Sequence, residues 1–399
     1  MSNEIPPRDS TGAMSSHPRI LVVLESLREN GAVRMMLTLL KEWNAAGLAA
    51  SLFVVQQAPD GDLAVVPEPV AVTTGTRRPA RVRATILPGM WRLLREVRQY
   101  DVVVSGSEIG LGLLLGYLTA RITRRTFVVA VHAHIEATVQ QWVPRPLRGL
   151  TRAAIAHCDA AVCASADLVP DVLQLGVRPG AVTVVRNGIS VPEVLARAQV
   201  GQSPTNADSP IVIATGRLSR EKGFDHLIAA HSEVLRDGIR HQLLILGEGP
   251  ERPRLEGLIR DLNLTQTVGL PGFLANPLPI MSAGALYCLS SIREGLPIAL
   301  LEAAALGVPI LATRASDAVI ELLGDGLYGD LVEAGSAHAL AAGLRRLLKQ
   351  PEGRRDRSAQ LLGQLRSYDM EAMCWTYLDA ISAAVERSSL RTSTTTARP

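Results

Sequence analysis

Short runs of aliphatic and β-branched residues alternate along this chain with longer segments whose apolar residues recur at helical spacing. This alternation is typical of βαβ units, which place parallel strands in one sheet and helices on its faces. The first series of expected strands covers residues 19–24, 50–55, 101–105, 126–132, 160–164 and 182–186. The second series covers residues 211–216, 242–247, 268–271, 285–289 and 309–313. Two series of this kind predict an α/β protein with two doubly wound domains.

Residues 192–210, between the two series, hold Gly201, Ser203, Pro204, Asn206, Asp208 and Ser209, a composition typical of a linker. At 399 residues the chain is long enough for two separate cores. We therefore expect a first Rossmann-like domain at 19–191 and a second at 211–368. Two such domains would face each other across a cleft at the carboxyl ends of their strands, where doubly wound folds bind ligands.

The two ends of the chain differ from the domains. Residues 369–387 carry apolar side chains at helical spacing, so we expect a helix that crosses back and packs on the first domain. Residues 1–18 are polar and lack the apolar core of a signal peptide. Residues 388–399 are rich in serine, threonine and arginine. A disordered leader and a disordered tail are the corresponding expectations.

Composition excludes several classes of protein. A formal net charge of +3 is too small for a dedicated nucleic-acid binder, which needs a strongly basic face. The four cysteines are scattered without a CxxC pair, which favours neither a zinc site nor a disulfide framework. No apolar run is long enough to span a bilayer. We expect a cytoplasmic protein.

The most informative local feature is a pair of glutamates, Glu294 and Glu302, separated by seven residues. Pro297 suits the first turn of a helix, and Gly307 with Pro309 suits its end. Glu294 would then lie at the mouth of the helix and Glu302 on its flank. Two such carboxylates can bind different hydroxyls of one polyol, while free N–H groups at the helix start accept a phosphate. The segment predicts a sugar nucleotide as ligand.

A second cluster of charge follows the first strand of the second domain. Arg217 and Lys222 lie five residues apart between Gly216 and Gly223, on the loop that leaves this strand. One guanidinium and one ammonium on such a loop can bind a diphosphate. A solvated loop with surface charges is the alternative.

The first domain offers a glycine and a histidine. Gly31 lies at the first strand-to-helix turn, where backbone can approach a phosphate; a plain helix start is the alternative. His132 ends an apolar strand and would point into the cleft, where it could bind a sugar hydroxyl or transfer a proton. A structural histidine is the alternative, and His134 is a second candidate for the same role.

These residues resemble the retaining glycosyltransferases of the GT-B fold, family 4, over the chain from residue 19 to about 386. The resemblance is strongest for Gly-Arg-Leu-Ser-Arg-Glu-Lys-Gly at 216–223 and for the paired glutamates at 294–302. Asn187-Gly188-Ile189 also matches the family, directly before the interdomain linker.

The resemblance implies a role for each matching residue. Arg217 and Lys222 would bind the donor diphosphate. Glu294 would contact the donor sugar and Glu302 the ribose hydroxyls, while His132 would lie near the reacting carbon. The other implied donor contacts are Gly31, Leu274, Gly295 and Leu296.

The implied activity is metal-independent transfer of a hexose-type sugar, with retention, from a UDP-glucose, UDP-N-acetylglucosamine or GDP-mannose type of donor.

Arg92, Arg95 and Arg98 alternate with Trp91, Leu94 and Val97, which predicts a basic amphipathic helix. Such a helix favours peripheral contact with the anionic inner face of a membrane and a lipid-linked saccharide acceptor in envelope or exopolysaccharide synthesis. Three alternatives remain: a soluble natural-product acceptor, a sugar-nucleotide epimerase, and a non-catalytic sugar-nucleotide-binding or scaffold protein.

Overall fold

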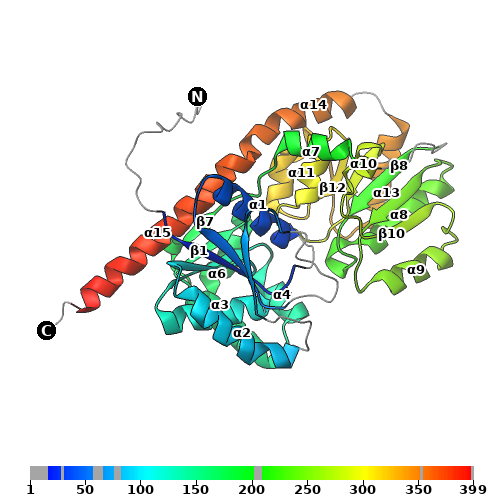
Figure 1. Cartoon of the computed structure of the whole chain (residues 1–399). Coiled ribbons are helices and arrows are strands. Elements are labelled where there is room, and N and C mark those ends of the chain that lie inside the picture. Colours follow the sequence, from blue (N-terminus) through cyan, green and yellow to red (C-terminus); the bar gives the residue numbers. More distant parts are fainter. Residues whose placement is uncertain are drawn as a thin grey trace.

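The computed structural model describes residues 17–27, 31–56, 66–75, 82–201, 209–350 and 354–396. Two parallel sheets, each flanked by helices, lie side by side (Figure 1). The first sheet has the order β3-β2-β1-β4-β5-β6-β7 and the second the order β10-β9-β8-β11-β12-β13. In both sheets the order reverses direction beside the first strand, which is the switch point of a doubly wound fold.

The first sheet is buried on both faces. Ile20, Val22 and Leu24 of β1 pack in one core, whereas Leu21 and Val23 pack in the other. Its strands are β1 (Ile20–Leu24), β2 (Ala50–Val54), β3 (Ala71–Thr74), β4 (Val102–Ser105), β5 (Thr126–Val131), β6 (Ala160–Cys163) and β7 (Val182–Val184). The helices of this part are α1 (Gly31–Ala45), α2 (Val82–Val97), α3 (Gly110–Thr123), α4 (Ile135–Trp142), α5 (Arg148–Ala156) and α6 (Val169–Gln174).

The second sheet has the same construction, with one core on each face. Its strands are β8 (Ile211–Thr215), β9 (Gln242–Leu246), β10 (Val268–Gly272), β11 (Leu286–Leu289), β12 (Ile310–Thr313) and β13 (Asp330–Val332). The accompanying helices are α8 (Phe224–Arg236), α9 (Arg252–Asp261), α10 (Leu278–Ser282), α11 (Ile298–Ala305), α12 (Asp317–Leu322), α13 (Ala337–Lys349) and α14 (Arg354–Gln364). The predicted α/β class with two doubly wound sheets is confirmed.

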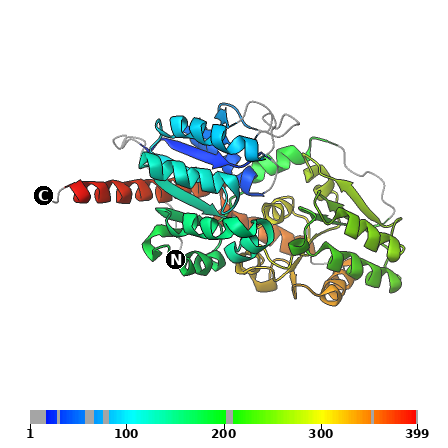
Figure 2. The same ribbon diagram turned by 90° about the horizontal axis from the view of Figure 1, so that it is seen from below.

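The final helix, α15 (Met370–Thr396), crosses back to the first sheet as predicted. Its Met373, Leu378 and Ile381 belong to the core around β1, and the indole Nε1 of Trp43 donates to the carbonyl of Cys374 at 3.1 Å. Figure 2 shows its C-terminal end projecting beyond the first domain. Because the packed turns already supply the nucleus, further turns add one hydrogen bond per residue. The helix therefore continues to Thr396, and the prediction of a disordered tail from residue 388 is wrong over 388–396.

The predicted linker is also partly wrong. Residues Val191–Ala198 form helix α7, in which Ser190 caps the first turn by accepting from the N–H of Glu193, and Pro192 occupies an early position. Val194 is buried in one of the two cores of the second domain. Pro192 is the first residue of the predicted linker, but proline also suits the first turn of a helix. Of the rest of the linker, residues 202–208 lie outside the described chain, as do residues 1–16 of the predicted leader.

Two strands were not predicted, β3 and β13. Both are edge strands, of four and three residues respectively. The side chains of β3 are exposed or half-buried, so it lacks the apolar run that marks the inner strands.

Two histidines lie in the interior of the second domain. The ring of His231, on α8, pairs through Nδ1 with Nε2 of His241 at 2.8 Å and through Nε2 with the hydroxyl of Thr267 at 3.0 Å. His241 Nδ1 lies 3.0 Å from the carbonyl of Ile239, which only accepts. Nδ1 of His241 therefore donates, its Nε2 accepts, and both rings are neutral. Burial, with the neighbouring ring, lowers the pKa of His231 to about 3, and burial lowers the pKa of His241.

These lowered pKa values predict loss of stability in acid. An unfolded histidine binds a proton below about pH 6.5, whereas folded His231 stays neutral down to about pH 3. The free energy of unfolding should therefore fall as the pH drops from about 6.5 towards 3, by up to about 1.4 kcal/mol per pH unit from His231, and the lowered pKa of His241 adds to the fall. Urea unfolding across this range measures the slope. In His231→Gln, where an amide replaces the titrating ring, the slope should be shallower.

His338→Gln, the same substitution at an exposed histidine of the second domain, controls for the general effect of replacing histidine by glutamine. Equal slopes in wild type and His231→Gln would contradict the assignment of a neutral buried pair.

Candidate functional site

The loop that follows β11 carries Glu294 to the cleft, where it forms an ion pair with Lys222. The hydroxyl of Ser291 donates to the same carboxylate oxygen at 2.7 Å. The side chains are only 22% exposed for Lys222 and 12% for Glu294, so solvent screens the pair weakly. Two residues predicted from separate motifs thus meet at one point.

Gly223 makes this meeting possible. Its φ is +60°, and a Cβ placed there would lie 2.3 Å from the carbonyl oxygen of Ser290. The hydroxyl of Ser290 in turn donates to the carbonyl of Lys222 at 2.8 Å. Only glycine combines the left-handed conformation with such close backbone contact. The short helical turn Arg220–Lys222 is therefore held directly against the end of β11.

Glu302 lies on α11, the helix predicted between Pro297 and Gly307, and its partner comes from the first domain. Nη2 of Arg34, on α1, donates to Oε1 of Glu302 at 2.5 Å. Glu302 is 1% exposed, and a buried carboxylate without a partner would be strongly destabilising. Arg34 was not predicted. Its signal in the sequence was its place one turn after Gly31, on the helix that starts beside the predicted phosphate loop.

The predicted glycines lie where the two domains touch. A Cβ on Gly295 would lie 2.9 Å from the carbonyl oxygen of His132, and one on Gly31 would lie 3.9 Å from Ile298. The side chain of Asn187 donates to the carbonyl of Leu296 at 2.7 Å. The structure thus gathers Gly31 and His132 of the first domain around the start of α11.

The ring of His132 has an unexpected orientation. It donates to the carbonyl of Gly106, and its Nε2 is buried without a hydrogen-bond partner among the described residues. Burial lowers its pKa to about 4, so the ring is neutral at pH 7. Its backbone N–H donates to Glu108 at 3.2 Å, a buried carboxyl whose pKa burial raises to about 7. His132 lies at the predicted position, but its carbonyl, rather than a ring nitrogen, contacts Gly295.

His134, the second candidate, has its partners within its own domain. Its Nδ1 lies 3.2 Å from Asp171 and its Nε2 3.5 Å from Asp167. Both ring nitrogens therefore face carboxylates of the first domain. This leaves His132 as the histidine beside Gly295.

Arg217 does not reach the Lys222–Glu294 pair through any contact of the described residues. Its guanidinium stacks instead on the ring of Trp142, the last residue of α4, with 4.3 Å between Cζ and the ring centroid. A Cβ on Gly216 would lie 3.5 Å from the stem of Lys222. The predicted pair of cations is therefore split, with Lys222 on Glu294 and Arg217 on the opposite domain.

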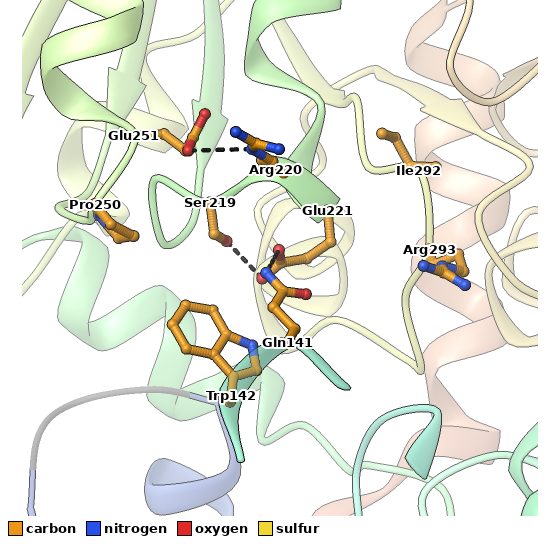
Figure 3. Close-up of a pocket in the computed structure, with 9 residues that line it drawn as sticks. All are labelled: Gln141, Trp142, Ser219, Arg220, Glu221, Pro250, Glu251, Ile292 and Arg293. Atoms are coloured by element: carbon orange, nitrogen blue, oxygen red, sulfur yellow. Dashed lines mark hydrogen bonds and ion pairs between the residues drawn. The ribbon is translucent and has the colours of Figure 1, made fainter. Parts of the chain in front are cut away.

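A pocket of about 480 Å³ opens next to these residues (Figure 3). The amide of Gln141 donates to Glu221 at 3.1 Å across it. Trp142 and Gln141 come from the first domain and face Ser219 and Glu221 of the second (Figure 3). The remaining lining residues are Arg220, Pro250, Glu251, Ile292 and Arg293. None of the lining was predicted, because residues from α4 and from three loops meet only through the docking of the two domains.

The side chains of the two predicted leucines, Leu274 and Leu296, pack in the second domain. Leu296 is 3% exposed and belongs to the core that includes the side chains of α11. Leu274, just after β10, packs against the same core. Their backbone groups remain the predicted donor contacts.

Among the described residues, no group of three or more histidine, cysteine, aspartate or glutamate side chains is placed to hold a metal.

Two family models match adjacent parts of this chain. The model described as "Glycosyl transferases group 1" matches residues 197–360, and "Glycosyltransferase Family 4" matches residues 29–192. The chain belongs to the group 1 glycosyltransferases of family 4. The Lys222–Glu294 pair and Glu302 lie within the group 1 match, and Gly31, Arg34 and His132 lie within the family 4 match.

Curated relatives of this glycosyltransferase match over part of their length. The alpha-D-kanosaminyltransferase of Streptomyces kanamyceticus is 36% identical over 158 residues, which is 39% of this chain and 41% of the relative. The lipopolysaccharide core biosynthesis glycosyltransferase LpsD of Rhizobium meliloti is 33% identical over 232 residues, 57% of this chain and 64% of the relative. The matches thus span less than two thirds of these relatives.

Solved structures share the fold. The Anabaena protein Alr3699/HepE, in complex with UDP and glucose, aligns with a TM-score of 0.76 at 20% identity over 92% of this chain and 100% of its own. WaaG, described as a glycosyltransferase involved in lipopolysaccharide biosynthesis, aligns with a TM-score of 0.70 at 17% identity over 90% and 98%. These likenesses confirm the predicted GT-B fold.

The close contact at Gly223 predicts a large effect of one methyl group. Gly223→Ala must move Ser290 away or abandon the left-handed conformation, and either displaces Lys222. Gly307, which also has a positive φ of +69° but no atom within 4 Å of an added Cβ, is the matched control. Gly307→Ala should cost about 1 kcal/mol from conformation alone. Gly223→Ala should cost roughly 2 kcal/mol more, measured by urea unfolding. Equal costs would contradict the packing described for Gly223.

Proposed function

We propose that this protein is a retaining glycosyltransferase that moves a hexose-type sugar from a nucleotide diphosphate sugar to an acceptor hydroxyl. The observation that carries the proposal is the Lys222–Glu294 ion pair beside the Gly295–His132 contact between the domains. A cation and a carboxylate at one point of a cleft suit a sugar diphosphate, which presents hydroxyls on one side of the breaking bond and negative charge on the other.

Each residue has a defined task in this proposal. Lys222 and Arg217 neutralise the diphosphate as it departs, which is the charge that builds up most in the transition state. Glu294 accepts from hydroxyls of the donor sugar, and Glu302 accepts from the ribose. Arg34, which holds Glu302 in the present structure, would rearrange or share that carboxylate when ribose binds. With two cations near the diphosphate, the reaction is proposed to need no metal ion.

Release of nucleoside diphosphate from a panel of sugar nucleotides, in the presence of EDTA, tests the donor site. UDP-glucose, UDP-N-acetylglucosamine and GDP-mannose form the panel. We expect release from one donor, and roughly a hundred-fold slower release in Glu294→Gln, because the neutral amide no longer holds Lys222 in place. Glu333→Gln is the control, since Glu333 is an exposed carboxylate of the same domain away from the pair.

The other outcomes separate the competing functions. Tight binding of UDP or GDP without release from any donor, with acceptor preparations included, would favour the non-catalytic binding protein. Conversion of a donor to an isomeric sugar nucleotide would favour an epimerase. Release that stops with EDTA and returns with a divalent cation would contradict the metal-free proposal.

For the acceptor we propose a lipid-linked saccharide that enters the pocket beside Trp142. Half-exposed tryptophan rings stack on sugar rings, and Glu221, Gln141 and Ser219 offer hydrogen bonds to hydroxyls. The printed names of two relatives support this acceptor class: LpsD, named for lipopolysaccharide core biosynthesis, and a Campylobacter jejuni relative named for a diphospho-undecaprenol substrate. The kanosaminyltransferase and a 2-deoxystreptamine glucosyltransferase of Streptomyces kanamyceticus support a soluble acceptor instead.

The surface of α2 favours the lipid-linked acceptor. The apolar face is only partly the predicted one: Val97 is buried as predicted, together with Leu93, whereas Trp91 is 59% and Leu87 72% exposed. Arg95 stacks on Trp91 at 4.9 Å. An exposed helix face with tryptophan, leucine and arginine is typical of peripheral membrane contact. None of the described helices has the length and apolar character needed to cross a bilayer.

Vesicle binding tests the membrane contact. Arg92 is left unchanged, because its guanidinium donates to the carbonyl of Thr74 at 3.1 Å and serves the fold. The variant Trp91→Ser/Arg95→Glu/Arg98→Glu should bind vesicles of phosphatidylglycerol and phosphatidylcholine at least roughly ten-fold more weakly. Arg240→Glu/Arg260→Glu, the same charge change on the exposed surface of the second domain, should bind like wild type. Unchanged binding in the α2 variant would favour a soluble acceptor.

A further inference from the structure

A small buried cavity of about 10 Å³ lies between the first sheet and the crossing helix α15. Most of its wall is apolar, from Met35, Val162, Val185 and Met373 among others. Asn187, whose amide donates to the carbonyl of Leu296, also lines it. The two other polar side chains of the lining are those of the site histidine, His132, and of Tyr377 on α15. The cavity therefore joins the chemistry of the cleft to the last helix of the chain.

Both of these polar groups end in an atom without a partner. His132 Nε2 and the Tyr377 hydroxyl are buried and make no hydrogen bond to any described residue. Tyr377 is 4% exposed, so bulk solvent does not reach its hydroxyl. Buried polar atoms are nearly always hydrogen-bonded, and two such orphans lining one cavity demand a common explanation.

The two atoms have complementary roles. The ring of His132 already donates to the carbonyl of Gly106 through its other nitrogen, so Nε2 of the neutral ring carries a lone pair and accepts. The phenol of Tyr377 can donate. A cavity of about this size is at the lower limit for a single water molecule, and polar groups around it satisfy such a molecule.

We propose that one buried water bridges His132 Nε2 and the Tyr377 hydroxyl, which makes Tyr377 the positioning residue of the site histidine. The water donates to Nε2, accepts from the phenol, and so holds the imidazole in the tautomer protonated at Nδ1. The orientation of His132 then depends on α15, a helix that follows the second domain in sequence and packs in the core of the first. The consequence for catalysis rests on the proposed function, because it takes His132 to border the reacting sugar.

Tyr377→Phe removes one hydroxyl and leaves the ring in place. With the bridge present, the variant loses a hydrogen-bonded group and should unfold at a lower urea concentration than wild type. With Tyr377 truly unpartnered, the same change removes an unsatisfied hydroxyl and should leave the midpoint unchanged or raise it. The sign of the shift therefore decides whether the hydroxyl has a partner, and a rise overturns the proposal.

Nitrogen NMR of histidine-labelled protein tests the partner itself, with His132→Gln to assign the signals. The Nε2 shift of His132 should move in Tyr377→Phe and stay in Tyr368→Phe, which removes the hydroxyl of another buried tyrosine that does not line the cavity. A high-resolution crystal structure should show the water at about 2.7–3.2 Å from both atoms. No water in the cavity, or no change at Nε2, overturns the proposal even in a protein without activity.

Kinetics test the positioning role separately. With a donor found in the release assay, Tyr377→Phe should lower kcat roughly 3- to 10-fold and leave the KM for the donor near that of wild type. Tyr368→Phe should change neither. A shifted Nε2 signal with unchanged kcat would retain the water bridge and overturn the positioning role. Failure of every donor in wild type would count against the proposed function, while the urea and NMR results still decide the bridge.

Discussion

The loop from Glu294 to Leu296, at the start of α11, is pressed against the first domain, and the candidate site depends on that contact. Gly295 lies against the His132 carbonyl, and Leu296 accepts from Asn187. Within the same few residues Glu294 pairs with Lys222 of its own domain. The short loop thus fixes the distance between two domains that are otherwise separate cores. Because backbone atoms and not long side chains make the closest approach, this distance has little freedom.

Charge at the interface follows the same geometry. Each cation assigned to the donor has a partner in the described structure: Lys222 has Glu294, and Arg217 has the ring of Trp142. Arg34 reaches across from α1 to the buried Glu302. These contacts neutralise groups that would otherwise repel one another or lie unpaired in a shielded cleft. In the proposed function, a donor would exchange partners with groups already held in place, which lowers the ordering needed at the moment of reaction.

The fold was largely predictable because its signals are local. Inner strands of a parallel sheet must be apolar on both faces, and the runs at β1, β4, β5, β8 and β11 show this in sequence. The edge strands β3 and β13 escaped prediction because an edge has less to bury. Helix α7 escaped because Pro192 starts helices as readily as it interrupts them. On α2, the spacing of Trp91, Leu94 and Val97 indicated an apolar face, but only Val97 of these residues belongs to the core, where Leu93 packs beside it.

The sequence by itself determined the two sheets, the return of α15 and the motifs at 216–223 and 294–302, since each depends on residues close together in the chain. Tertiary structure alone decided which motifs meet. Arg34 and Glu302 are 268 residues apart, and Arg217 finds Trp142 on the opposite domain. His132 and Tyr377 line one cavity for the same reason. Such pairs follow from how two finished cores dock, and the docking surface is assembled from loops whose positions no local pattern encodes.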